Sequence, residues 1–161
     1  MRGEFKDVNE AKDFFRQIRK EQAEVEHLQS LIAKTRLSLL PKGIRYDTDR
    51  VQTSPGDPMT ETAAIIADYN RQLNESLAKL MQRKVEAEQL IMSLENTDER
   101  DVMRLYYMET QETSDTKERV LYSWEQVASE KYMNKRWVLK LHGRALIHLL
   151  TKEDTKRHHE V

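Results

Sequence analysis

Apolar residues that recur at heptad spacing predict a long helix in the first part of the chain, from about Asn9 to Leu40. A seven-residue repeat keeps side chains on one side of a helix, so it marks a face that is buried against a partner. One heptad position holds Ile18, Val25, Ile32 and Leu39, and the other holds Phe14, Glu21, Leu28 and Thr35. Pro41 and Gly43 then end the helix, as chain breakers do just past the last apolar residue.

The same spacing predicts a second long helix, from about Thr60 to Leu94. Its heptad positions hold Ile66, Leu73, Leu80, Ala87 and Leu94 in one row, and Ala63, Asn70, Leu77, Lys84 and Ile91 in the other. Residues 41–59, between the two helices, contain all three prolines of the chain and predict a loop. Two such helices joined by a loop favour a long antiparallel helical hairpin, a coiled coil, in which Asn70 and Lys84 set the register or the oligomeric state.

A third helix is predicted from about Glu99 to Met108, after a turn and N-cap at Asn96 to Asp98. The segment that follows, from Glu109 to Glu118, is polar, and we expect it to be a mobile connection. At the other end of the chain, residues 151–161 have no apolar periodicity and are expected to form a flexible tail.

Two short capped helices are predicted between these segments. Ser123 and Gln126 form the capping-box pattern at the start of the first, and Asn134 is a suitable N-cap for the second. Two helices separated by a short turn are typical of a helix-turn-helix, whose second helix enters the major groove of DNA.

The last helix has one apolar and one basic side. On a helical wheel Val138, Leu141, Ala145 and Leu149 face inward, and Arg136, Lys140, Gly143 and Arg144 face outward, with Lys135 and Leu139 beside them. No acidic residue interrupts the chain from Lys131 to His148, which favours a DNA-binding surface. The alternative is an ordinary amphipathic helix whose basic side is solvated.

Composition supports an all-α fold. Charged residues make up 34% of the chain, with only 4 Gly and 3 Pro, which is typical of long helices with much exposed surface. Residues 123–161 hold 8 Lys and Arg against 5 Asp and Glu, whereas the chain as a whole has a net charge of −1. The positive charge therefore gathers at the C-terminal end, which favours a nucleic-acid partner there.

Several classes of protein are excluded by what the sequence lacks. The chain has no Cys, so it forms neither disulfides nor a thiolate zinc site. No apolar run reaches membrane-spanning length and the charged N-terminus is no secretory signal, so we expect a soluble, cytoplasmic protein. No phosphate loop, nucleophile motif or spaced His and carboxylate set is present, which predicts a non-enzyme without cofactor or metal.

Three segments between residues 96 and 150 resemble sigma-70 region 4, and they occur in the same order. They are the helix T-D-E-R-D-V-M-R-L-Y-Y at 97–107, the helix S-W-E-Q-V-A at 123–128 and the recognition helix V-L-K-L-H-G-R-A-L at 138–146. This resemblance implies a three-helix DNA-binding module. Nothing in the chain resembles the promoter-melting region of sigma factors, so it is not expected to act alone as one.

The whole chain is similar to small phage and prophage proteins of Gram-positive bacteria that combine a heptad region, a V-Q-x-S-P loop and a sigma-region-4-like end. The loop motif is V-Q-T-S-P at Val51–Pro55. The family is similar to late-gene transcriptional regulators of the ArpU and RinA type. The resemblance implies a helical-hairpin region at 1–95, a helix-turn-helix domain at 96–150 and the tail.

The resemblance also implies which residues contact DNA. Lys135, Arg136 and Lys140 are expected at base edges or in the groove, where Arg and Lys bind guanine. Arg144 and Lys131 are expected at phosphates, and Asn134 lies at the start of the recognition helix. Sigma factors often carry a polar reader where this chain has Trp137 and Leu139, so no base-reading role is transferred to these two. Core or boundary packing is expected for both Trp124 and Trp137.

The sequence therefore predicts a phage-type transcriptional regulator in the cytoplasm of a bacterial host, which binds double-stranded DNA as a homodimer. Two alternatives remain open. One is a DNA-packaging oligomer that resembles a small terminase subunit, and the other is a coiled-coil adaptor whose basic helix binds an acidic partner such as RNA polymerase.

Overall fold

The computed structural model describes residues 5–39 and 58–150, and these residues form five helices and one two-stranded sheet. The elements are α1 (Val8–Ser38), α2 (Pro58–Met92), α3 (Thr97–Tyr107), β1 (Thr110–Glu112), β2 (Arg119–Leu121), α4 (Trp124–Glu130) and α5 (Lys135–His148). The prediction of a mostly helical protein is confirmed. The greater part of the predicted loop, the Val51–Pro55 motif and the predicted tail 151–161 lie outside the described residues.

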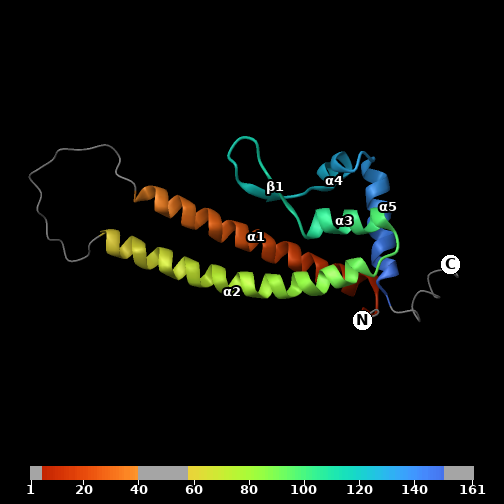
Figure 1. The fold of residues 1–161 in the computed structure, drawn as a ribbon, viewed down its shortest axis with the longest axis horizontal. Coiled ribbons are helices and arrows are strands. Elements are labelled where there is room, and N and C mark those ends of the chain that lie inside the picture. The colour runs from red at the N-terminus through yellow and green to blue at the C-terminus, as the bar shows by residue number, and fades with distance from the viewer. Residues whose placement is uncertain (1–4, 40–57, 151–161) are drawn as a thin grey trace, which may run out of the picture.

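Helices α1 and α2 lie side by side and run in opposite directions (Figure 1). The apolar rows predicted from heptad spacing are buried most completely toward the end of the pair that carries the N-terminus of α1. Buried members are Ile18, Val25 and Ile32 of α1, and Leu80, Ala87 and Ile91 of α2. The predicted Phe14 is only half-buried, and its neighbour Phe15, which lies outside the predicted rows, is fully buried instead. At the start of α2, Ala63 is exposed and Ile66 is only half-buried. The two helices are therefore packed together mainly along the second half of α2, from Leu80 onward.

The helix boundaries agree closely with local capping signals. The side chain of Asp7 accepts a hydrogen bond from the backbone N–H of Glu10 at 2.8 Å, which starts α1. Helix α2 begins at Pro58, slightly before the predicted Thr60, because proline is well tolerated in the first turn of a helix. Asn96 caps α3 through the backbone N–H of Glu99.

The segment predicted to be a mobile polar connection is instead an ordered β-hairpin. Strand β1 pairs antiparallel with β2, and Gln111 lies opposite Val120. The turn between them includes Lys117 with a positive φ of 55°. The Arg119 guanidinium donates to the Thr110 hydroxyl at 2.8 Å and to its carbonyl at 3.0 Å, which ties the two strands together. Strands this short and polar carry no recognisable alternation of apolar residues, so the prediction missed them.

A small core unites α3, α4 and α5. Its buried members are Val102 of α3, Val127 and Ala128 of α4, and Val138 and Leu141 of α5. The four residues predicted to face inward from the last helix are all buried, with Ala145 at 0% and Leu149 at 3% exposure. The apolar side of α5 is therefore assigned correctly from its 3.6-residue periodicity.

A larger core joins these helices to the α1–α2 pair. It contains Phe15 of α1, Ile91 of α2, Tyr107 of α3 and Leu146 of α5, all at 2% exposure or less. Phe5 closes this core at the N-terminal side, where it forms an isolated bridge with Leu150. The predicted boundary between residues 95 and 96 stays a prediction, and the packing is continuous across it.

Candidate nucleic-acid interface

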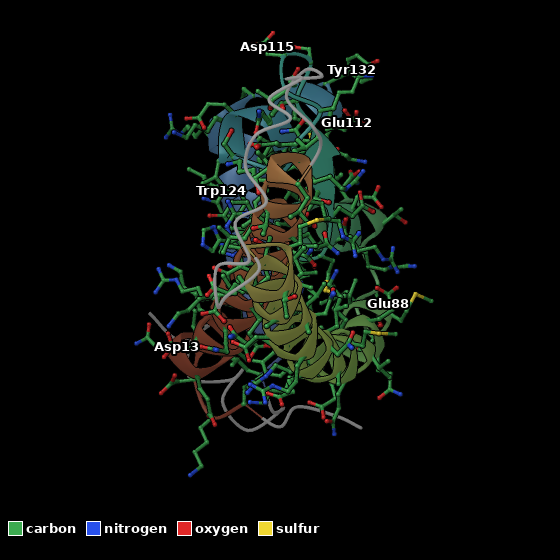
Figure 2. The ribbon with its side chains drawn as sticks, turned by 90° about the vertical axis from the view of Figure 1, so that its left-hand side faces the viewer. Asp13, Glu88, Glu112, Asp115, Trp124 and Tyr132 are labelled. Carbon is green, nitrogen blue, oxygen red and sulfur yellow. The ribbon has the colours of Figure 1, made fainter. Side chains whose placement is uncertain are left out.

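Side-chain caps fix the starts of both α4 and α5. The Ser123 hydroxyl accepts a hydrogen bond from the N–H of Gln126, whose side chain accepts from the N–H of Ser123 at 2.8 Å, so the predicted capping box is confirmed. The side chain of Asn134 accepts from the N–H of Trp137 at 2.7 Å and starts α5. Tyr132, between the two helices, has a positive φ of 54° and is 97% exposed (Figure 2).

Three cations lie on the outer side of α5 without a carboxylate partner. Arg136, Lys140 and Arg144 are exposed, as predicted, and form no ion pair with any residue in the ranges 5–39 and 58–150. Helix α5 itself contains no acidic residue. Like charges held on one rigid helix create a positive potential that attracts a polyanion. We call Arg136, Lys140 and Arg144 the basic face of α5.

Lys131 and Lys135, predicted with the same set, are engaged differently. Lys131 Nζ lies 2.7 Å from Asp101 Oδ2 and 3.4 Å from Asp98 Oδ1, both on α3. The hydrogen bond to Asp101 raises the pKa of Lys131 above its ordinary value. Lys135 Nζ lies 2.6 Å from Glu125 Oε1, and this contact lowers the pKa of Glu125. A DNA phosphate has to displace a carboxylate to reach either lysine.

Trp137 lies at the boundary of α5 and not in a core. Its side chain belongs to neither buried cluster and is 38% exposed. Lys140 Nζ lies 5.6 Å from the centre of its ring, and Arg144 Cζ lies 5.5 Å from it. Distances under about 6 Å are typical of cation–π contacts. Because α5 places residues three and seven positions after Trp137 on the same side, the ring lies beside two members of the basic face.

Trp124, by contrast, packs as predicted. Its ring stacks on Tyr106 with centroids 3.6 Å apart and an interplanar angle of 8°. The imidazole of His142 lies against it at 4.7 Å between ring centres. Trp124 is therefore a packing residue at the edge of the small core, and Trp137 is the tryptophan that remains open to a partner.

Gly143 lies in the interior of α5, close to the basic face. A Cβ at this position meets no heavy atom within 4 Å outside its own helix backbone. Close packing within the described residues therefore does not require glycine here.

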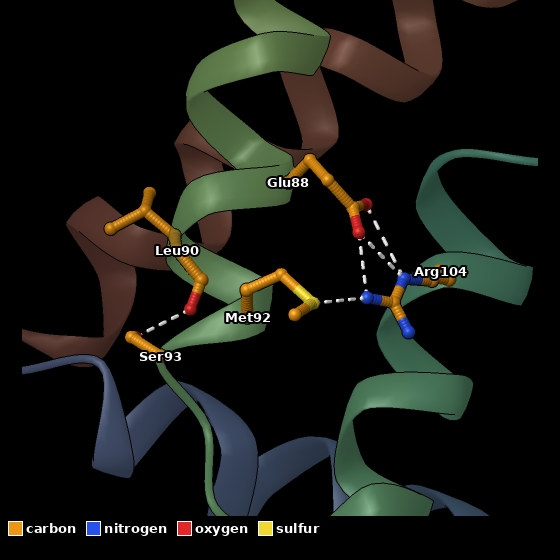
Figure 3. Close-up of polar contacts among 5 residues, drawn as sticks. All are labelled: Glu88, Leu90, Met92, Ser93 and Arg104. Atoms are coloured by element: carbon orange, nitrogen blue, oxygen red, sulfur yellow. Dashed lines mark hydrogen bonds and ion pairs between the residues drawn. The ribbon is translucent and has the colours of Figure 1, made fainter.

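Polar contacts anchor α3, and with it α5, to the long helices. Arg104 binds Glu88 of α2 through two nitrogens, with Nη2 at 2.6 Å and Nε at 3.0 Å from Oε1, and Nη2 also contacts the Met92 sulfur (Figure 3). Lys84 Nζ donates to the carbonyl of Met108 at 3.0 Å, at the C-terminus of α3. Burial lowers the pKa of Lys84, although Glu26 and Glu109 oppose the shift. The predicted seam lysine therefore caps a neighbouring helix.

Residues 5–39 and 58–150 contain neither a membrane-spanning helix nor a metal-binding cluster. No helix there is both long and apolar enough to cross a membrane. No group of three or more His, Asp or Glu in these ranges has an arrangement that could hold a metal ion.

Comparison of the chain with known proteins identifies no relative, so the function has to be inferred from the geometry of the site. No protein family model matches the sequence. No curated protein and no solved structure matches it either.

Proposed function

We propose that the protein is a sequence-specific DNA-binding transcriptional regulator of phage or prophage genes, and that α4 and α5 act as a helix-turn-helix. The observation that carries this proposal is the basic face of α5, three exposed cations with no carboxylate partner among the described residues. Other exposed cations nearby, such as Lys135, already have an acidic partner. Unpaired cations on a rigid surface helix suit a phosphate backbone, which releases counterions when they bind.

Helix α5 has the dimensions and support needed for groove binding. It follows a short capped helix, its apolar side is fixed in the small core, and its basic face points away from that core. The major groove of DNA admits one α-helix, and Arg or Lys there can bind guanine O6 and N7. We assign Arg136 and Lys140 to base edges and Arg144 to a phosphate. Lys131 and Lys135 contribute less to DNA affinity, because each has to break its ion pair with a carboxylate before it can bind a phosphate.

The proposal includes a homodimer that forms through the long helices as a coiled-coil hairpin. Five large apolar side chains of α2 are exposed, Met59 at 63%, Ile65 at 47%, Met81 at 64%, Val85 at 60% and Met92 at 56%. A surface of this kind supports self-association. A dimer places two recognition helices on two half-sites, which raises affinity without new contacts in each subunit.

DNA binding by the variant Arg136→Ala/Lys140→Ala tests this function. We expect its affinity for duplexes enriched from random sequence by the wild-type protein to fall at least about tenfold, since each lost base contact costs on the order of 1–3 kcal/mol. The matched control is Lys20→Ala/Arg36→Ala, which removes two exposed cations from α1. Circular dichroism verifies that both variants stay helical. Equal affinity of the two variants would contradict the assignment of the reading helix.

The two alternatives give different outcomes in the same experiments. A ring of many subunits, measured by light scattering, favours a DNA-packaging oligomer over a regulator. Failure of the wild-type protein to bind any duplex at low salt favours an adaptor whose basic face binds an acidic protein such as RNA polymerase.

A further inference from the structure

Trp137 is an aromatic side chain that takes part in neither core of the protein. It is 38% exposed and lies outside both buried clusters, whereas Trp124 is stacked at 3.6 Å on Tyr106. The exposed part of the ring is apolar, so covering it in a complex is energetically favourable. The cap of α5 uses only the backbone N–H of Trp137, which any residue except proline supplies.

The surroundings of the ring indicate the chemistry of its partner. Lys140 and Arg144 lie 5.6 Å and 5.5 Å from its centre, and no acidic residue lies on α5. A partner that covers this surface is therefore expected to offer negative charge next to an apolar group. On the major-groove edge of DNA, the apolar group is the C5-methyl of thymine, and phosphates line both rims of the groove.

We propose that Trp137 reads thymine by covering its C5-methyl group, while Lys140 and Arg144 move from the ring to the DNA. This inference rests on the proposed DNA-binding function and deepens it, because it names a base and a residue that reads it. In the free protein the ring holds the two cations at the basic face. In the complex the cations bind phosphate or guanine and uncover the ring for the methyl group.

The position of Trp137 along the helix fits this role. It lies in the first turn of α5, where the N-terminal residues of a recognition helix contact base edges. Leu139, the other exposed apolar residue of α5, is 40% exposed and lies on the opposite flank of the basic face. Its exposed fraction is close to that of Trp137, so it serves as a matched control for loss of exposed apolar surface.

A methyl-deletion cycle tests the proposal. A duplex enriched from random sequence by the wild-type protein is prepared twice, once with thymine and once with deoxyuridine at each thymine. Deoxyuridine pairs like thymine but lacks the methyl group. Affinities of both duplexes are measured for wild type, Trp137→Ala, Trp137→Gln and Leu139→Ala. Because DNA shape changes equally for all four proteins, the ratio of the two affinities isolates the contribution of each side chain.

The expected result is a wild-type preference for the thymine duplex of about fourfold for each methyl group covered. Both Trp137 variants lose this preference, and Leu139→Ala keeps it. A Trp137 variant that weakens both duplexes equally would overturn methyl reading, and so would loss of the preference in Leu139→Ala alone. Trp137→Gln keeps the result interpretable if the alanine variant is poorly folded. If the wild-type protein binds no duplex, the proposed function itself is wrong. If it binds both duplexes with equal affinity, only the reading of the methyl group by Trp137 is wrong.

Discussion

Tyr107 and His142 share a hydrogen bond at the place where the two cores meet. The Tyr107 hydroxyl lies 2.7 Å from His142 Nε2, and the two residues are 1% and 7% exposed. Tyr107 belongs to the large core, and the His142 ring also contacts Trp124 at the edge of the small one. Burial raises the pKa of Tyr107, so the hydroxyl stays protonated beside the imidazole.

This pair predicts a loss of stability in mild acid. Burial, assisted by Lys12 and Arg16, lowers the pKa of His142 from its ordinary 6.5 to about 4. In the unfolded chain the imidazole takes up a proton near its ordinary pKa, whereas the folded protein excludes that proton until about pH 4. The contribution of His142 is therefore complete above pH 6.5 and falls as the pH drops toward 4.

We expect His142 to lower the free energy of unfolding by at most about 3 kcal/mol between pH 7 and pH 4. The measurement is urea denaturation across that range for wild type and His142→Gln. The glutamine keeps a polar partner for Tyr107 but does not titrate. If the difference in free energy of unfolding between the two proteins stays constant with pH, His142 is not the group whose protonation destabilises the fold.

The Arg104–Glu88 ion pair is predicted to stabilise the attachment of α3 to α2. Its bidentate geometry is favourable, but the two side chains are 27% and 44% exposed, so water screens the interaction. A double-mutant cycle with Glu88→Gln and Arg104→Gln should give a coupling of about 0.5–1 kcal/mol that weakens with added salt. The exposed pair Asp68–Arg71 within α2 is the control and should give a smaller coupling. Equal coupling free energies for the two pairs would show that the bidentate geometry of Arg104 and Glu88 adds no stability.

Replacement of Gly143 by alanine is predicted to stabilise the protein. Alanine favours helix over glycine by about 0.5–1 kcal/mol, and the added Cβ meets no neighbour within 4 Å. The free energy of unfolding of Gly143→Ala should rise by that amount. A decrease would indicate an unfavourable contact that the folded structure does not contain.

Tyr132 is predicted to carry backbone strain. Its φ of 54° is costly for a residue with a Cβ, and its side chain is 97% exposed, so little packing is lost on truncation. Tyr132→Gly should therefore raise stability by about 0.5–1 kcal/mol. Lys117, with a φ of 55° in the β-hairpin turn, gives a parallel test as Lys117→Gly. Destabilisation by the first substitution alone would point to a packing role for the tyrosine ring.

Features encoded by a few neighbouring residues were predictable from the sequence. The capping box of Ser123 and Gln126, the cap at Asn134 and the buried side of α5 follow from patterns only a few residues long. The helical periodicity of α1 and α2 is similarly local. Local signals suffice here because caps and amphipathic faces depend on residues within a turn or two.

Features that depend on distant residues were not predictable. Lys131 pairs with Asp101, which lies 30 residues earlier, and Lys84 caps α3 at Met108, which lies 24 residues later. The exposure of Trp137 follows from the packing of α5 on its neighbours, which spacing alone does not reveal. These contacts decide which cations are free to bind DNA. The sequence alone proposed six DNA-binding residues, and only the folded structure shows that three of them, the basic face of α5, have no carboxylate partner among the described residues.

The salt dependence of DNA binding tests the central claim most directly. Affinity of wild type for its enriched duplex should fall steeply as salt rises, because bound cations release counterions from DNA. The variant Arg136→Ala/Lys140→Ala/Arg144→Ala should bind at least about tenfold more weakly, with the slope of log affinity against log salt reduced by about one for each lost phosphate contact. An unchanged affinity and slope in this variant would contradict the claim that the basic face of α5 binds DNA.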